Sequence, residues 1–223
     1  MKPALELEGA SIVLRGTFSP YLFQPAWFAR HQLLRDSEVE KPDSLVVTND
    51  VTTFECGWLR VEVTSDRFTV HSLDGSNLEP LRDLVIGTFT LLEQTPFYQM
   101  GLNRYFHFRM LSEDEWHLIG DTLVPKALWQ SLFEGRVGMR VLSVEGKRPN
   151  STARYVRVTV EPSIKVLPHG LFIQTNEHYQ READDPAGRA DLLEILKQTW
   201  GDSLAYSKKM SEWIVAQTLE GRV

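Results

Sequence analysis

The fold of this 223-residue chain is decided by two short stretches, Leu59-Arg60-Val61-Glu62-Val63 and Val156-Arg157-Val158-Thr159-Val160. Each alternates apolar with polar or hydroxyl-bearing side chains, the pattern of a strand that buries one face. Their arginines stand 157 − 60 = 97 positions apart. Pro25 and Pro125, each followed by a run containing aromatic residues, stand 125 − 25 = 100 positions apart. The similar spacing predicts that one structural unit occurs twice along the chain.

The residues around the first stretch predict a first repeat over residues 10–96. Asn49-Asp50 is turn chemistry and predicts a hairpin, whereas an apolar stripe at intervals of three or four residues, with Asn77 as its N-cap, predicts a long helix. The expected order is a strand at 11–18, a short helix from Pro25 to Leu34, strands at 45–48, 53–56, 58–64 and from Phe68, and a helix at 78–92.

A second repeat is expected over residues 101–219. It would contain strands at 102–109, 138–144, 154–160 and 171–175, a short helix at 125–133 and a closing helix from Asp191 onward. Within that helix, Gly201-Asp202-Ser203 predicts a kink or a restart, because glycine is costly in a helix interior and Asp and Ser cap well.

These elements predict the α+β class. A strand–helix–strands–helix unit buries one sheet face under its long helix, and two such units can pair their edge strands. We therefore expect one antiparallel sheet covered on one face by helices, within a single pseudo-twofold domain spanning residues 1–223.

The duplicated element order resembles the saddle of the TATA-binding protein, which implies a curved antiparallel sheet with helices on its convex side. No DNA-reading motif of that family maps onto this chain, and the net charge of −6 departs from its basic character, so DNA bending is not carried over. The run 59–68, the helix after it and Gly101-Leu102-Asn103-Arg104-Tyr105 are also similar to a sporadically distributed family of uncharacterised bacterial proteins. That resemblance implies an accessory role and no particular chemistry.

Composition limits the classes of function. A hydrophobic content of 42% supports a packed core, and the acidic balance makes nucleic-acid binding unlikely unless a basic patch is present. Cys56 is the single cysteine, which excludes an internal disulfide and favours a reducing compartment. The first residues lack the apolar run of a signal peptide, and no stretch is long enough for a membrane span. A cytoplasmic protein without membrane contact is expected.

Four basic residues form the candidate ligand site. His107 and Arg109 share one face of a predicted strand, and Arg60 and Arg157 fall on equivalent strands of the two repeats. If that face is the concave side of the sheet, the four residues are candidates for binding an anionic ligand. The alternative is that they are the ordinary outward residues of one-sided antiparallel strands.

Other chemistry has weaker support. Glu113-Asp114-Glu115-Trp116-His117 offers ligand-type side chains, but adjacent residues rarely converge on one ion, so a solvated loop is expected. Cys56 is expected to be a buried, apolar thiol. No catalytic residue, metal or cofactor is predicted. Six aromatic residues are expected in the core: Trp27, Phe28, Trp129, Phe133, Trp200 and Trp213.

The leading functional hypothesis is a non-enzymatic binding protein or accessory factor that contacts a protein partner through its sheet face or its C-terminal helix. One alternative is an anionic small-molecule binder, or an enzyme, that uses the basic residues on the sheet. A further alternative is nucleic-acid binding on the sheet. The sequence leaves the oligomeric state open.

Overall fold

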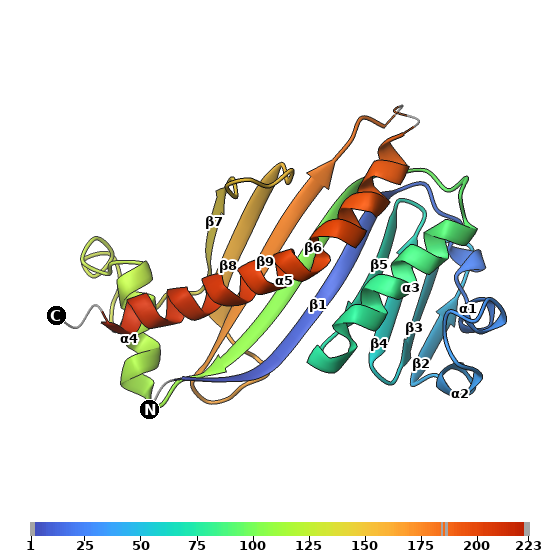
Figure 1. The fold of residues 1–223 in the computed structure, drawn as a ribbon. Helices are drawn as coiled ribbons and strands as arrows, with labels where there is room; N and C mark the ends of the chain where they lie inside the picture. The colour runs from blue at the N-terminus through green and yellow to red at the C-terminus, as the bar shows by residue number, and fades with distance from the viewer. Residues whose placement is uncertain (1–2, 184, 186, 221–223) are drawn as a thin grey trace.

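A computed structural model describes residues 3–183, 185 and 187–220, and shows an α+β architecture built on one nine-stranded antiparallel sheet (Figure 1). The strand order is β2-β3-β4-β5-β1-β6-β9-β8-β7. The strands are β1 (Ala4–Gly16), β2 (Ser44–Val47), β3 (Val51–Cys56), β4 (Leu59–Thr64), β5 (Arg67–Ser72), β6 (Phe97–Arg109), β7 (Leu142–Gly146), β8 (Tyr155–Pro162) and β9 (Gly170–Gln180). The helices are α1 (Pro25–Arg30), α2 (Asp36–Val39), α3 (Leu78–Leu91), α4 (Glu113–Leu123) and α5 (Gly188–Glu220), with 3-10 turns η1 (Pro20–Leu22) and η2 (Gly75–Asn77).

The centre of the sheet is the pairing of β1 with β6, two antiparallel strands of 13 residues each. On one side of this pair lie β5, β4, β3 and β2, and on the other lie β9, β8 and β7. A register shift between Leu5 and Leu7 marks an irregularity near the start of β1. Segments almost 100 residues apart, such as Ser11 and Asn103, are thus direct neighbours.

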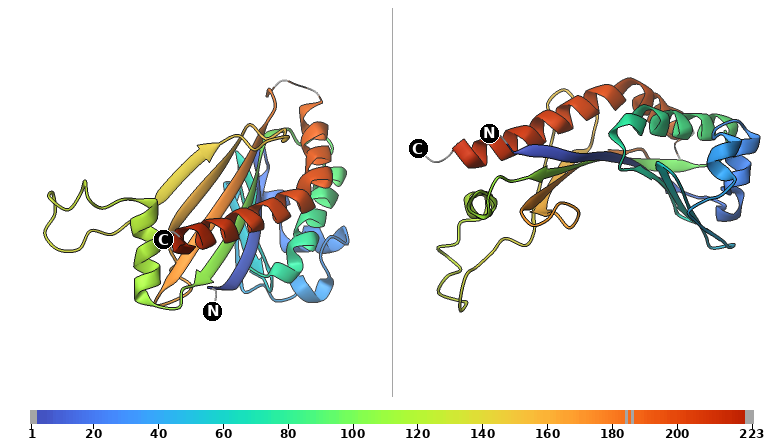
Figure 2. Two further views of the ribbon diagram at one scale, coloured as in Figure 1. Left: turned by 60° about the vertical axis from the view of Figure 1, so that its left-hand side comes forward. Right: turned by 90° about the horizontal axis from the view of Figure 1, so that it is seen from below.

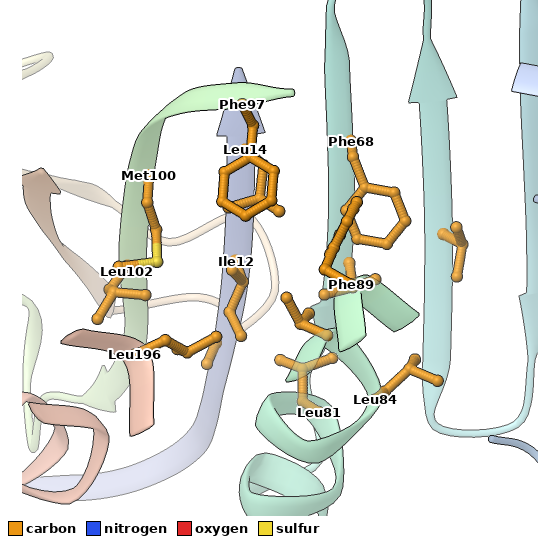
Figure 3. Packing of buried hydrophobic residues seen from close by; sticks show 14 of the residues in the cluster. Ile12, Leu14, Phe68, Leu81, Leu84, Phe89, Phe97, Met100, Leu102 and Leu196 are labelled. Atoms are coloured by element: carbon orange, nitrogen blue, oxygen red, sulfur yellow. The ribbon is translucent and has the colours of Figure 1, made fainter. Parts of the chain in front are cut away.

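Helices α3 and α5 lie on the same face of the sheet, and the opposite face carries neither of them (Figure 2). The period of two in β1 sends Ala10, Ile12 and Leu14 toward the helices, and all three are fully buried. Aromatic and aliphatic side chains from α3, β1, β5 and β6 interlock beneath α3, including Phe89 and Phe68 (Figure 3). The main hydrophobic core therefore lies between α3, the first part of α5 and the sheet.

Helix α5 is continuous over 33 residues, although it bends along its length (Figure 2). Gly201-Asp202-Ser203, where the sequence predicted a kink or a restart, lies within this bent helix and does not interrupt it. Leu192, Leu196 and Trp200 in its first part are buried in the main core. Its second part instead buries hydroxyl groups, from Ser203, Ser207 and Ser211.

A charged network is buried beneath the middle of α5. Glu177 on β9 is fully buried, accepts a hydrogen bond from Tyr179 Oη at 2.8 Å and pairs with Arg148 Nη1 at 3.0 Å. Arg104 on β6 is also fully buried, and its guanidinium carbon lies 3.8 Å from the centroid of a Trp200 ring. Burial lowers the pKa of Arg104 to about 10, and the charge of Glu177 opposes that shift.

Several sequence expectations are confirmed. The hairpin around Asn49-Asp50 is β2–β3, Pro25 begins α1, and the apolar stripe after Asn77 is α3. Asn77 precedes α3, but its side chain does not cap that helix. It donates to Asp74 Oδ2 at 2.6 Å instead.

Other expectations are wrong. β1 begins at Ala4 and not at Ser11, because β6 continues alongside and supplies hydrogen-bond partners for the whole run. Residues 125–133 form turns in place of the predicted short helix. The helix of this region is α4, whose N-cap Ser112 accepts a hydrogen bond from the Glu115 backbone N–H at 3.2 Å. The strand expected at 138–144 begins only at Leu142.

Candidate functional site

The sheet face that faces away from α3 and α5, here called the open face, carries a straight row of polar residues across eight strands. The registers of neighbouring strands place these residues directly opposite one another. From β3 to β7 the row reads Glu55, Arg60, His71, Ser11, Asn103, Asn176, Arg157 and Glu145. Arg60 and Arg157 each stand second from an end of this row, and a glutamate stands at each end.

The side chains at the centre of this row are hydrogen-bonded to one another. Asn103 Nδ2 donates to Ser11 Oγ at 3.0 Å, and Asn176 Nδ2 donates to Asn103 Oδ1 at 2.7 Å. Ser11 and Asn103 are both buried, so the polar groups meet each other more than they meet solvent. The amides at the middle of the open face therefore stabilise the pairing of β1, β6 and β9.

The charged flanks of the row are paired as well. Arg60 Nη1 lies 3.0 Å from Glu55 Oε1, and Arg157 Nη2 lies 2.8 Å from Glu145 Oε2. The hydrogen bond that Arg157 donates to Glu145 raises the pKa of Arg157. The positive charge of each arginine is thus already balanced by a carboxylate on the next strand toward the edge of the sheet.

The structure places all four predicted ligand-binding residues on the open face, but it does not bring them together. Arg60 on β4 and Arg157 on β8 are five strand spacings apart, about 24 Å at the usual separation of strands. Arg109 lies at the far end of β6, where it forms an ion pair with Glu6 that raises its pKa. The four residues do not form a single anion site.

His107 occupies a separate environment on the same face. Its Nδ1 lies 2.8 Å from Ser163 Oγ, and its ring stacks on Phe172 at 4.6 Å between centroids. Desolvation, followed by the positive charge of Lys165, lowers the pKa of His107. The imidazole is therefore held in its neutral form, next to a shallow pocket.

The acidic cluster Glu113–His117, expected as a solvated loop, is the first part of α4. Acidic side chains at a helix N-terminus are favoured by the helix dipole, which explains their sequence without a ligand. Across the described parts of the chain, no three His, Cys, Asp or Glu side chains are arranged to hold a metal ion. Cys56 is buried as predicted, and desolvation is the largest cause that raises the pKa of its thiol to about 11.

Of the six aromatic residues expected in the core, three lie in the core or pack against it and three do not. Phe28 and Trp200 are fully buried, and Trp27 packs against the core. Trp129, Phe133 and Trp213 are instead exposed, by 44%, 60% and 61%. Burial of the first two was predicted because the short helix expected at residues 125–133 would cover the sheet, but these residues form turns and leave the sheet.

Trp129, Phe133 and Trp213 lie at one end of the molecule, here called the α4 end. It comprises α4, the projecting segment of residues 124–141 and the last turns of α5. The projecting segment extends away from the sheet on the side opposite to α5 (Figure 2). Besides its two aromatics it exposes Leu128 by 79% and Leu132 by 68%.

The same end carries an apolar groove along the last turns of α5. The groove measures 720 Å³ and is lined largely by apolar side chains that include Leu5, Phe108, Trp213, Ala216 and Leu219. Lys209 adds one positive charge to its lining, and Glu115 and Glu212 add two negative charges. The C-terminal helix therefore offers a second apolar surface at the α4 end.

No protein-family model matches this chain, and no curated protein sequence is significantly similar to it. Among the described residues, no helix combines the length and the apolar character that a membrane span requires.

Proposed function

We propose that this chain is a non-enzymatic binding protein that contacts a protein partner through the α4 end. The observation that carries the proposal is the exposure of Leu128, Trp129, Leu132 and Phe133 within six residues of a projecting segment. Large exposed apolar clusters are rare on proteins without partners, and Trp, Phe and Leu at a protruding position can fill a pocket of a partner.

The sequence predicted two interaction surfaces, the C-terminal helix and the sheet face, and both reach the α4 end on opposite sides of the sheet. Trp213 and Leu219 line the groove on α5, and the projecting segment lies on the side of the open face. A partner that held the projecting segment would therefore also meet polar and ion-paired side chains of the open face. Such a combination of an apolar centre and a polar periphery is the usual composition of a protein interface.

Nucleic-acid binding on the sheet is less well supported. Phosphate binding requires cations that are free to replace counterions, but Arg60, Arg157 and Arg109 are each paired with a carboxylate. The overall charge of −6 adds a repulsive field. An electrophoretic mobility assay at low salt is expected to show no shift of single-stranded DNA or RNA.

We also propose that residues 10–96 and 101–219 are copies of one unit, arranged as a TATA-binding-protein-like saddle. The strand order supports this, because β4-β5-β1 and β6-β9-β8 mirror each other about the central pair. The open-face row supports it too, since Arg60 and Arg157 hold matching places in that order. In this arrangement α4, and not residues 125–133, is the counterpart of the short helices after β1.

Site-specific photo-crosslinking in the native host tests the partner proposal. A benzophenone-bearing amino acid at Leu128 is expected to yield a defined protein adduct, because that side chain is 79% exposed on the projecting segment. The matched control carries the same group at Leu91, which is 50% exposed at the other end of the molecule. Adding Leu132→Ser and Phe133→Ser should abolish the adduct at Leu128.

Two results would contradict the proposal. One is an identical adduct pattern from Leu128 and Leu91, which would mean that the projecting segment meets no particular partner. The other is a catalytic rate in the purified protein that one substitution abolishes.

A further inference from the structure

A pocket on the open face lies beneath the connection between β8 and β9. It measures about 180 Å³, and its lining includes His71, Tyr105, His107 and Phe172 from the sheet and Ile164 and Lys165 from the connection. Pockets for drug-sized ligands usually measure about 300–1,000 Å³. This one therefore suits a single ring with small substituents.

The walls of the pocket are rings that hold one another in place. Tyr105 and Phe172 stack at 6.1 Å with 23° between their planes, and His107 stacks on Phe172 at 4.6 Å with 27° between their planes. His71 meets Tyr105 edge-on at 5.2 Å. The Tyr105 hydroxyl is fixed by Ser11 Oγ at 2.7 Å. A planar ring could enter this arrangement without reorganising it, which keeps the cost of binding low.

The hydrogen bonds of Ser163 fix the tautomer of His107. Ser163 Oγ accepts from the backbone N–H groups of Lys165 at 3.1 Å and Val166 at 2.9 Å, so both of its lone pairs are used. Its own hydrogen must then be donated to His107 Nδ1. Nδ1 is therefore the acceptor, and Nε2 of the neutral ring carries the hydrogen.

The connection that covers the pocket is held tightly against the sheet. A Cβ at Gly170 would lie 1.9 Å from the Val166 carbonyl oxygen, so only glycine permits this approach. The Ser163 N–H also donates to the Gly170 carbonyl at 2.9 Å. Lys165 is thereby positioned over the rings by the backbone.

Two polar features of the pocket are not used within the chain. His71 Nε2 is buried and has no hydrogen-bond partner among the described residues. Lys165 forms no ion pair with a described residue. Its charge lowers the pKa of His107 after the larger effect of desolvation, and it lowers the pKa of His71 after desolvation and the charge of Arg60. A buried polar nitrogen and an unpaired ammonium beside aromatic walls would suit a ligand with a planar ring and a negative charge.

We infer that this pocket binds a planar aromatic carboxylate, with its ring against Tyr105 and Phe172 and its carboxylate at Lys165. Glu161, which also lines the pocket, provides an acceptor for a hydroxyl or amino group on the ring. The cation is Lys165 and not any of the arginines of the open-face row. This inference goes beyond partner binding at the α4 end, and neither depends on the other.

The test uses 4-hydroxybenzoate as the probe and the imidazole proton resonances of the full-length chain as the readout, at pH 7.5. Saturable shifts of the His71 and His107 signals are expected. 4-Hydroxybenzamide, which keeps the ring and lacks the charge, and cyclohexanecarboxylate, which keeps the charge and lacks the planar ring, should each bind at least about tenfold more weakly.

Variants assign the binding to the pocket. Lys165→Gln should weaken the binding of 4-hydroxybenzoate about tenfold, because it removes a charge-assisted contact, whereas Lys147→Gln on an exposed turn should not change it. A peptide ending in a C-terminal tyrosine carries the same phenol ring and a free carboxylate, which a short aliphatic link separates from the ring. Tighter binding of that peptide would assign the ligand to a protein chain. No shift of either imidazole at 10 mM 4-hydroxybenzoate, or equal shifts in Lys165→Gln, would overturn the inference.

Discussion

The two ends of the helix-covered face are built differently. Under α3 the space is filled by phenylalanine rings, with Phe89 within 5.0 Å of Phe68 and of Phe97 between ring centroids. Under the second part of α5 a smaller apolar cluster, which includes Phe106 and Val215, lies next to buried hydroxyl groups, where Thr175 Oγ1 donates to Ser207 Oγ at 2.8 Å. The buried ion network of Arg104 and Glu177 lies between these two ends.

The difference indicates a division of roles along one sheet. Dense aromatic packing contributes stability through buried apolar area, and its cluster at the α3 end is the larger of the two. The α4 end has the smaller cluster and carries the exposed aromatic residues. Trp129, Phe133 and Trp213 were all expected in the core and all lie at this end. Residues that depart from the folding pattern in this way are more often functional than structural.

The largest expected effect is at the α3 end. Phe89→Ala should lower the free energy of unfolding by about 3–5 kcal/mol, because it removes a fully buried ring that contacts four other phenylalanines. Phe133→Ala, the same change at the α4 end, should alter it by less than about 0.5 kcal/mol. Urea denaturation measures both. Equal losses of unfolding free energy would show that the two ends contribute equally to stability.

A smaller effect is expected at the boundary between the ends. Glu177→Leu should cost about 3 kcal/mol, because it leaves Arg148 without its ion-pair partner and the fully buried Arg104 without its largest compensating charge. Adding Arg104→Met removes that uncompensated charge, so the double variant should be more stable than the sum of the two single changes predicts. Strictly additive losses in a double-mutant cycle would show that these two charges do not interact.

The smallest expected effect is the dependence of stability on pH, which arises from the open face. Burial lowers the pKa of His71, His107 and His178 below their ordinary value of 6.5, so the unfolded chain binds more protons as the pH falls. Stability from these groups is therefore complete above pH 6.5 and is lost as the pH falls through their lower folded-state pKa values.

The variant His107→Asn isolates one of these contributions, since an amide oxygen at that position can accept the Ser163 hydroxyl hydrogen. Between pH 6.5 and 5 its unfolding free energy should fall less steeply than that of the unchanged protein. Parallel curves from urea denaturation across this range would show that His107 does not contribute.

Much of the fold follows from local patterns in the sequence. Turn residues and alternation identified the β2–β3 hairpin and the strand that carries Arg60, because both depend on neighbouring residues. The full length of β1 could not be predicted, since it depends on pairing with β6 almost 100 residues away. The burial of Arg104 could not be predicted for the same reason, because it depends on contact with Trp200, which is far from Arg104 in the sequence.

The candidate sites were less predictable than the fold. Alternation predicted that His107 and Arg109 share one face of a strand, but it carries no information about the lateral distance to Arg60 and Arg157 or about the acid that pairs with each arginine. Lys165 lies in a connection, and its position over His107 depends on the close approach that Gly170 permits. Such a contact requires three-dimensional geometry.

The pairing of β1 with β6 also sets an order of events during synthesis. β1 can align with β5 once residue 72 has emerged, and α3 can then cover that part of the sheet. The other edge of β1 has no partner until residue 109 leaves the ribosome. During that interval the nascent chain exposes one unpaired edge of a 13-residue strand, to which another chain can add. Slow translation of residues 73–109 should therefore increase aggregation of this protein.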